Sequence, residues 1–180
     1  MTQSPYTGVR FDRMETLLTA FAYLTIFALL AALAWRDLLE YILPNEMNAA
    51  LAISCMALHI AGRWQWISPV DAVIGALVGG GFLLTVGLLA DRFYKKDSLG
   101  MGDVKLMAAA GLGLGFPNIM LAMSIGAFVG VLHGGLIAYL RKLKGEKDVV
   151  FSEINVPAGL GLAVGIAIVM LHQYGFDPFR

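Results

Sequence analysis

Charged residues are scarce in this chain of 180 residues, where Lys, Arg, Asp and Glu together make up 14% and the net charge is zero. Proteins that bind nucleic acid carry an excess of basic residues, so we expect no nucleic-acid partner. Cysteine is almost absent, since Cys55 is the only one, which excludes an intramolecular disulfide and a cysteine-rich metal site. Any function that depends on charge must therefore come from a few local side chains.

Apolar residues take the place of the missing charge and make up 58% of the chain. This composition is typical of membrane proteins. A helix that crosses a bilayer needs about 20 mostly apolar residues, and the run 16–35 contains no charge. It lacks the small-residue cleavage site of a signal peptide, so we interpret it as the first membrane span, preceded by a polar segment, 1–15.

Further apolar runs predict five more spans. Two of them are 47–62 and 72–90, and the last is 154–176. The uncharged run 106–140 is too long for one span, and Phe116-Pro117-Asn118 is a turn signal within it, so we divide it into two helices. The sequence therefore predicts an all-α membrane protein, a polytopic bundle of about six transmembrane helices, in one domain over 16–176.

Basic residues indicate the orientation of these spans, because Lys and Arg concentrate in cytoplasmic loops. If the chain crosses the membrane six times, nine Lys and Arg residues fall on one side: Arg36, Arg92, Lys95, Lys96, Lys105, Arg141, Lys142, Lys144 and Lys147. The other side has Arg10, Arg13, Arg63 and Arg180. We therefore expect 36–46, 91–103 and 141–153 to face the cytoplasm and both termini to lie on the other side of the membrane.

Two aspartates lie at span boundaries on this cytoplasmic side. Asp37 follows the first span, and Pro44 and Asn45 come after it, with Asn45 interpreted as the N-cap of the second span. Asp103 opens the fourth span, where the helix dipole favours a carboxylate. That span has about fourteen residues, or roughly 21 Å, against a hydrocarbon core of about 30 Å. The short helix would draw Asp103 toward the membrane.

Two carboxylates that share such a site cannot both ionise easily, so one would keep its proton. The charged member can take a proton from a water that attacks a peptide carbonyl, while the protonated member can hydrogen-bond that carbonyl. This chemistry needs no metal or other cofactor. Because a carboxylate in a bilayer costs about 2.5–3.5 kcal/mol, the pair indicates a function.

Simpler roles remain open for each of these residues. Asp37 could anchor the helix end beside Arg36, and Asp103 could be the N-cap of the fourth span. Lys105 could extend to the interface or tune the charge of Asp103. A small transporter or proton relay and a non-enzymatic scaffold for secretion assembly are alternative functions. The three histidines, His59, His133 and His172, are expected to be packing or interfacial residues.

These patterns together resemble the type IV prepilin peptidases. That family pairs an aspartate, followed at seven and eight positions by Pro and Asn or Asp, with a Gly-x-Gly-Asp motif that opens a later span. Asp37 with Pro44-Asn45 matches the first element, and Gly100-Met-Gly102-Asp103-Val-Lys105-Leu matches the second. The resemblance extends over about 35–165. Ala158 departs from it, because relatives often have an aromatic residue after the corresponding proline.

The resemblance implies a GxGD-type membrane aspartyl endopeptidase of a type IV pilus or type II secretion system. Such an enzyme cleaves the basic leader of prepilins or pseudopilins at the cytoplasmic face of the inner membrane. Asp37 and Asp103 would be catalytic, and five residues would support the site: Gly100, Gly102, Lys105, Pro44 and Asn45. Long family members contain Cys-x-x-Cys pairs and also methylate the new N-terminus. Since this chain has one cysteine, we assign no methyltransferase activity.

Overall fold

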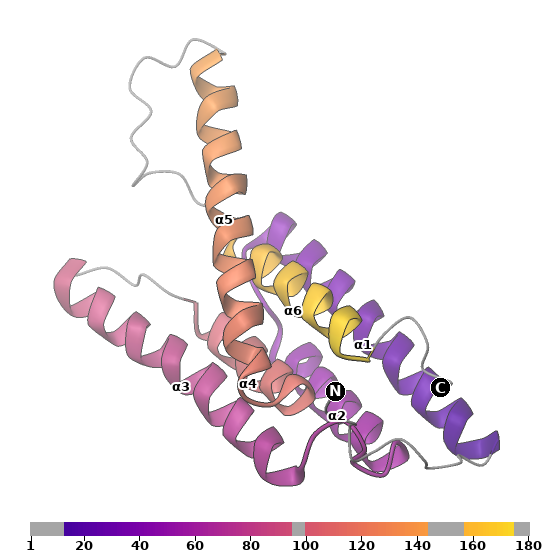
Figure 1. Ribbon diagram of the computed structural model, residues 1–180. Coiled ribbons are helices and arrows are strands. Elements are labelled where there is room, and N and C mark those ends of the chain that lie inside the picture. The colour runs from indigo at the N-terminus through magenta and orange to yellow at the C-terminus, as the bar shows by residue number, and fades with distance from the viewer. Residues whose placement is uncertain (1–12, 95–99, 144–156, 175–180) are drawn as a thin grey trace, which may run out of the picture.

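The computed structural model describes residues 13–94, 100–143 and 157–174. These residues form six helices, and no strand is found among them. The helices are α1 (Arg13–Glu40), α2 (Asn45–Ala61), α3 (Pro69–Tyr94), α4 (Met101–Leu114), α5 (Asn118–Leu143) and α6 (Ala158–Tyr174). Figure 1 shows them in chain order. The all-α class and the six predicted helices are confirmed.

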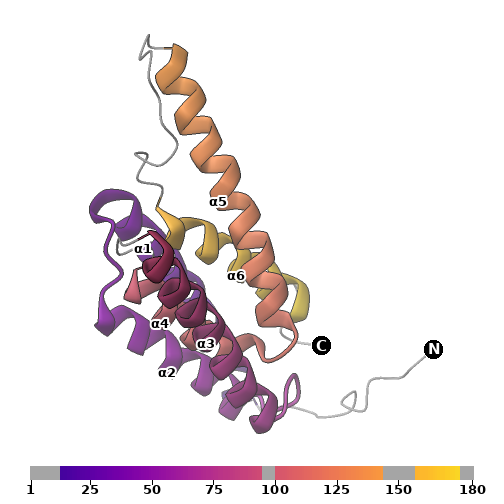
Figure 2. The ribbon, with the colours of Figure 1, turned by 90° about the vertical axis from the view of Figure 1, so that its left-hand side faces the viewer.

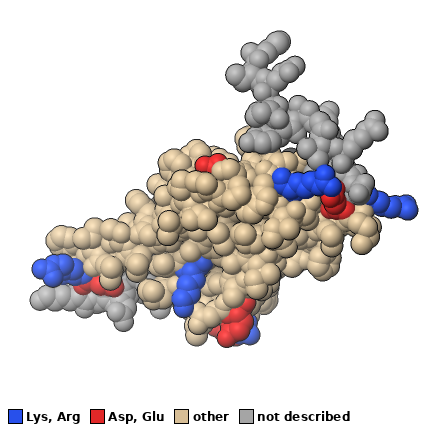
Figure 3. Space-filling view, turned by 90° about the horizontal axis from the view of Figure 1, so that it is seen from below, with Lys and Arg blue, Asp and Glu red and all other residues tan. Residues whose placement is uncertain are grey.

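The helices fall into a long set and a short set. α1, α3 and α5 are long and apolar enough to cross a membrane. The other three, α2, α4 and α6, have 17, 14 and 17 residues, so their lengths are about 26, 21 and 26 Å at the helical rise. Figure 3 shows a face that is mostly uncharged, with Lys, Arg, Asp and Glu in a few small groups. This arrangement fits a helical membrane bundle.

Helix α1 is longer than the first predicted span. It continues to Glu40, so Asp37 lies inside the last turn of the helix, whereas the first span was predicted to end at residue 35. Arg36 and Glu40 form an ion pair one turn apart, which favours the helix there. The chain then turns at Tyr41, where φ is 54°.

Two N-cap predictions were wrong. Helix α2 begins at Asn45, its N-cap is Pro44, and no side chain caps it. The N-cap of α4 is Gly100, again without a side-chain hydrogen bond, and Asp103 lies inside the first turn. Pro44 and Gly100 have the extended backbone angles of cap residues. Asn45 and Asp103 therefore lie inside their helices and not at the cap positions.

The predicted break in the run 106–140 is confirmed. Helix α4 ends at Leu114, and the next residue, Gly115, has a φ of 68° and a ψ of −179°, a region that essentially only glycine adopts. Helix α6 begins at Ala158, later than its predicted start at Ile154. Residues 154–156 and 175–176 of that span lie outside the described residues, as do 1–12, Lys95, Lys96, Lys144 and Lys147.

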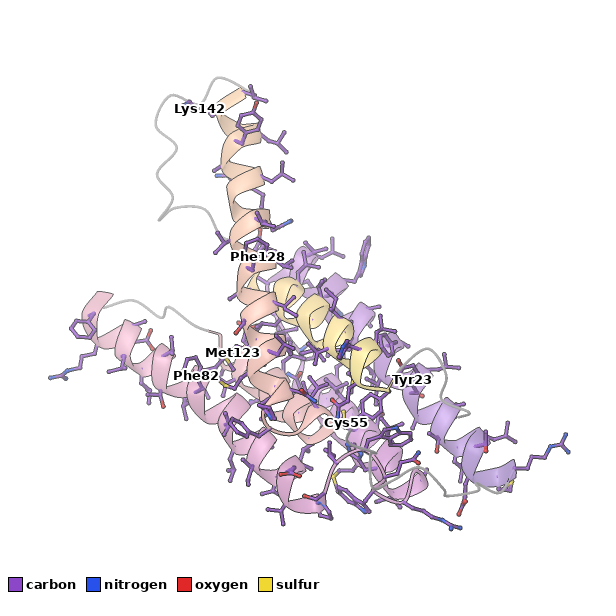
Figure 4. The ribbon with its side chains drawn as sticks, in the orientation of Figure 1. Tyr23, Cys55, Phe82, Met123, Phe128 and Lys142 are labelled. Atoms are coloured by element: carbon purple, nitrogen blue, oxygen red, sulfur yellow. The ribbon has the colours of Figure 1, made fainter. Side chains whose placement is uncertain are left out.

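Four helices, α1, α2, α4 and α6, surround the part of the interior that matters for function, and each contacts its neighbours. Figure 4 shows Cys55 inside this group, where its thiol is fully buried. Leu33, Leu106 and Met170, from three of these helices, are also fully buried. The remaining helices, α3 and α5, pack on the outside and diverge from each other (Figures 1 and 2).

Glycines bring the outer helices close to the inner ones. A Cβ on Gly75 of α3 would lie 2.4 Å from the carbonyl oxygen of Gly111 in α4. A Cβ on Gly165 of α6 would lie 2.6 Å from the nitrogen of Gly126 in α5. Such close backbone contacts are typical of small residues between membrane helices, so these glycines fix the positions of α3 and α5.

Candidate active site

Asp37 lies at one end of the bundle, against the beginning of α6. Its side chain is 5% exposed. The Oδ2 atom accepts a hydrogen bond of 2.9 Å from the backbone N–H of Leu160. Since α6 begins at Ala158, this N–H is one of the first four in the helix, which have no partner inside it. The carboxylate of Asp37 therefore satisfies the N-terminus of α6, where the helix dipole favours a negative charge.

Gly159 makes this close approach possible. A Cβ at this position would lie 2.9 Å from Oδ2 of Asp37 and 2.9 Å from Cδ1 of Leu43. Real Cβ atoms are not found at such distances without a shift of the neighbours. The absence of a side chain at residue 159 thus lets the carboxylate reach the N–H of Leu160.

Asp103 is the second buried carboxylate at this end. It lies in the first turn of α4 and is 8% exposed. Its Oδ1 atom is buried and has no hydrogen-bond partner within the described part of the chain. Its Oδ2 atom lies 3.3 Å from the point where a Cβ on Gly100 would be. Among the described residues, Asp103 therefore has one oxygen without a donor, whereas Oδ2 of Asp37 has the N–H of Leu160.

Leu43 links the surroundings of the two aspartates. A Cβ on Gly102 would lie 2.7 Å from Cβ of Leu43, and a Cβ on Gly159 would lie 2.9 Å from its Cδ1. This leucine thus contacts the glycine before Asp103 and the glycine beside Asp37. Both carboxyl groups are buried at this end of the bundle. The structure therefore brings both into one buried site.

The beginning of α2 supports the start of α4. Nδ2 of Asn48 donates a hydrogen bond of 3.3 Å to the carbonyl oxygen of Gly102. Nζ of Lys105 donates one of 2.6 Å to Oδ1 of Asn45. Lys105 is exposed, and its described hydrogen bond goes to Asn45 and not to Asp103. These contacts hold the Gly-Met-Gly-Asp turn against α2.

A model of the type IV leader peptidase family matches residues 24–135. This match covers more than half of the chain and includes both aspartates. The chain belongs to the type IV leader peptidase family. No solved structure matches the chain with comparable significance.

Three relatives illustrate the similarity to the type IV leader peptidase family, and each is named "Prepilin leader peptidase/N-methyltransferase". The protein of Aeromonas hydrophila is 29% identical over 138 residues, which is 77% of this chain and 47% of that protein. The protein of Pectobacterium carotovorum is 32% identical over 112 residues, 59% of this chain and 38% of that protein. The protein of Escherichia coli K12 is 33% identical over 103 residues, which is 56% of this chain and 45% of that protein. The chain thus spans about half the length of the first of these relatives.

The site of this leader peptidase family member contains most of the residues that the sequence singled out. The two aspartates lie together with Gly100 and Gly102. Asn45 is connected to them by the hydrogen bond that it accepts from Lys105. Pro44 precedes α2 as its N-cap. Lys105 was expected either to extend to the interface or to tune the charge of Asp103. It is exposed, and its amine binds Asn45 at the beginning of α2.

Three further residues were not found from the sequence: Leu43, Asn48 and Gly159. Asn48 follows Asn45 by three residues and so lies on a similar face of α2, a signal that was available. Gly159 lies 122 residues after Asp37, and no local pattern connects them. Its role follows only from the way in which α6 packs against α1.

His59 lies near the end of α2, away from Asn45 and the aspartates. His59 is fully buried, its Nε2 lies 3.0 Å from the carbonyl oxygen of Gly113, and its ring stacks on Trp64. Tyr174 donates a hydrogen bond to the same carbonyl and lies edge-on to Tyr23, which Figure 4 labels. These contacts join α1, α2, α4 and α6 at the end of the bundle opposite to the carboxylates. The packing role predicted for His59 agrees with its contacts.

Proposed function

We propose that this chain is a membrane aspartyl endopeptidase that cleaves the basic leader of a prepilin or pseudopilin, with Asp37 and Asp103 as the catalytic pair. The observation that supports this most directly is the burial of both carboxyl groups in one site of a leader peptidase family member. Residues 16–176 would form the peptidase domain. The proposal is limited to the peptidase reaction, because the single Cys55 gives no basis for the methyltransferase part of the relatives' name.

The two aspartates differ in a way that suggests separate roles. The N–H of Leu160 donates to Asp37, and such a bond favours the ionised carboxylate. Oδ1 of Asp103 is buried without a donor among the described residues, which favours the protonated acid, as does the nearby charge of Asp37. We therefore assign the role of base to Asp37 and the role of acid to Asp103 in the resting pair.

This assignment gives a complete reaction. Asp37 removes a proton from a water molecule as the water oxygen attacks the scissile carbonyl carbon, and Asp103 gives its proton to the carbonyl oxygen. The tetrahedral intermediate then collapses: the C–N bond breaks, the leaving nitrogen receives the proton held by Asp37, and Asp103 recovers a proton from the intermediate's hydroxyl. The pair returns to its starting state.

The charge distribution supports a site at the cytoplasmic face of a bacterial inner membrane. The end of the bundle that holds the aspartates carries the described basic residues Arg36 and Lys105, and the helices that point the same way end at Arg92, Arg141 and Lys142. Basic residues favour the cytoplasmic side. A prepilin leader, which is basic, would remain in the cytosol while its apolar segment lies in the bilayer. Both termini of the chain would then be external.

The test is incubation of the purified chain in detergent with a prepilin, followed by mass spectrometry. Asp37→Asn and Asp103→Asn should each lower the cleavage rate by about 10²–10⁴-fold, the usual contribution of a general acid or base. Glu46→Gln is the matched control, because this carboxylate lies in the first turn of α2 and is exposed. It should cleave at the wild-type rate.

Several outcomes would contradict the proposal. Cleavage at the normal rate by either Asp→Asn variant would remove that residue from the catalytic pair. No cleavage of any prepilin or pseudopilin by the wild-type chain would refute the peptidase function itself. Secretion or pilus assembly that survives replacement of both aspartates in cells would support a scaffold instead.

A further inference from the structure

A small groove lies between α1 and α6, close to Asp37. It encloses about 170 Å³. The α1 wall consists of Phe27, Leu30, Ala31 and Ala34. All of these side chains are apolar, and two of them are alanines, which leave room on the helix surface. The groove is therefore a recess in the outer surface of the bundle that faces apolar surroundings.

The α6 wall has the same character. It consists of Ala163, Val164 and Ala167. Ala167 comes four residues after Ala163 and three after Val164, so the three residues share one side of the helix. No charged or hydrogen-bonding side chain lines the groove from either helix. An occupant would therefore have to be apolar.

The groove lies between the same two helices as the hydrogen bond of Asp37 with Leu160. On α1, Leu30 and Ala34 come seven and three residues before Asp37, and these spacings place all three on one face. On α6, Ala163 comes three residues after Leu160, whose N–H binds Asp37. Both walls thus run from the hydrogen bond between Asp37 and Leu160 into the membrane part of the bundle. The groove continues the site away from the carboxylates.

The size of the groove fits one large side chain. An apolar cavity of about 150 Å³ accommodates a benzene-sized group, and this groove has about 170 Å³. A single aromatic or branched aliphatic side chain would fill it, while a whole helix would lie over it. The alanines of both walls would let such a helix approach closely.

We propose that this groove binds an apolar side chain of the substrate, from the hydrophobic helix that follows the scissile bond. The proposal rests on the proposed peptidase function and adds a specificity site to it. A polypeptide in a bilayer must be helical to satisfy its backbone, and a helix rises about 1.5 Å per residue. The groove begins three residues and ends ten residues from Asp37 along α1. The bound side chain therefore comes from about three to ten residues beyond the scissile bond.

Filling the groove tests the proposal. Ala31→Trp and Ala167→Trp fill it from opposite walls and should each lower kcat/KM for a prepilin by about tenfold or more, as expected for the loss of an apolar subsite. Ala28→Trp is the matched control, because Ala28 is an exposed alanine on the same helix that does not line the groove. It should keep the wild-type value.

A substrate change gives a second, independent readout. A series of prepilins with single alanine substitutions over about three to ten residues after the scissile bond should contain one or more that recover cleavage by Ala31→Trp, since the smaller side chain leaves space for the tryptophan. The recovering positions should be spaced by three or four residues. Loss of activity through misfolding of Ala31→Trp would not be recovered by a smaller substrate side chain.

Crosslinking provides a readout that does not need turnover. In an Ala31→Cys/Asp103→Asn chain, oxidation should join Cys at position 31 to a prepilin with a single Cys at the recovering positions. The native Cys55 is fully buried and gives the background in the chain without the Ala31→Cys change. No crosslink at any position, together with equal kcat/KM for Ala31→Trp and Ala28→Trp, would show that the groove holds only lipid chains.

These outcomes separate the two proposals. If the wild-type chain cleaves the prepilin but filling the groove has no effect, the subsite is wrong and the peptidase function stands. If the wild-type chain cleaves no prepilin, the peptidase function fails, and the substrate subsite fails with it.

Discussion

Gly159→Ala is the substitution that most directly tests how α6 places Asp37. The added Cβ would lie 2.9 Å from Oδ2 of Asp37, while ordinary van der Waals contact begins at 3.4 Å. Either the carboxylate or the start of α6 must therefore move by about 0.5 Å. Because the Oδ2 atom accepts the N–H of Leu160 at 2.9 Å, such a shift would stretch this hydrogen bond beyond its normal range of about 2.7–3.2 Å.

The size of the effect on the reaction follows from this displacement. A misplacement of about 1 Å can lower a rate by about 10²-fold, so a shift of about 0.5 Å should lower kcat by about tenfold. KM should change little, because the contact involves the proposed base, Asp37, and not the apolar part of the substrate. The assay is steady-state cleavage of a prepilin by the purified chain, with thermal unfolding in detergent to measure the folded fraction.

Gly81→Ala is the matched control for this experiment. A Cβ at that position would have no atom within 4 Å, so the site is undisturbed, and an alanine should favour the helix by about 0.5–1 kcal/mol. Full kcat in folded Gly159→Ala would refute the reasoning, because it would mean that the reaction does not depend on the close contact between Asp37 and the start of α6.

Two further predictions concern the surroundings of the site. Gly75→Ala should destabilise the chain by about 1–3 kcal/mol, a usual cost of overpacking, because its Cβ would lie 2.4 Å from the carbonyl oxygen of Gly111. Denaturant unfolding in detergent measures this loss of stability. A stability equal to that of Gly81→Ala would contradict the prediction. Lys105→Gln, which removes the charge but can still donate to Asn45, should keep more than half of the wild-type kcat. A shift in the pH profile of kcat for this variant would show instead that the charge of Lys105 tunes the aspartates.

Much of the fold follows from local patterns in the sequence. Uncharged runs indicate the membrane helices, and Phe116-Pro117-Asn118 correctly indicates the end of α4. The helix ends were less predictable. The first span was predicted to end at residue 35, where the charged residues begin, but the helix continues past Asp37, with an ion pair between Arg36 and Glu40. The side chains of Asn45 and Asp103 suit a cap position, yet Pro44 and Gly100 occupy those positions.

The candidate site was predictable only in part, for a physical reason. Asp37 and Asp103 each have a distinctive local sequence, so both were found. Their partners are set by packing between distant helices: Leu160 is 123 residues from Asp37, and Asn48 is 54 from Gly102. Nothing in a local pattern indicates which helix start will face a carboxylate.

The separation between Asp37 and Leu160 also has a consequence for biosynthesis. The first helix enters the membrane early in translation, but the N–H that binds its aspartate belongs to the last described helix and is made 123 residues later. Until α6 is inserted, Asp37 has neither this donor nor the positive end of a helix dipole beside it. A nascent chain would therefore carry its motif residues in the membrane before the proposed acid–base pair is assembled, and the proposed proteolysis could begin only once synthesis of the bundle is nearly finished.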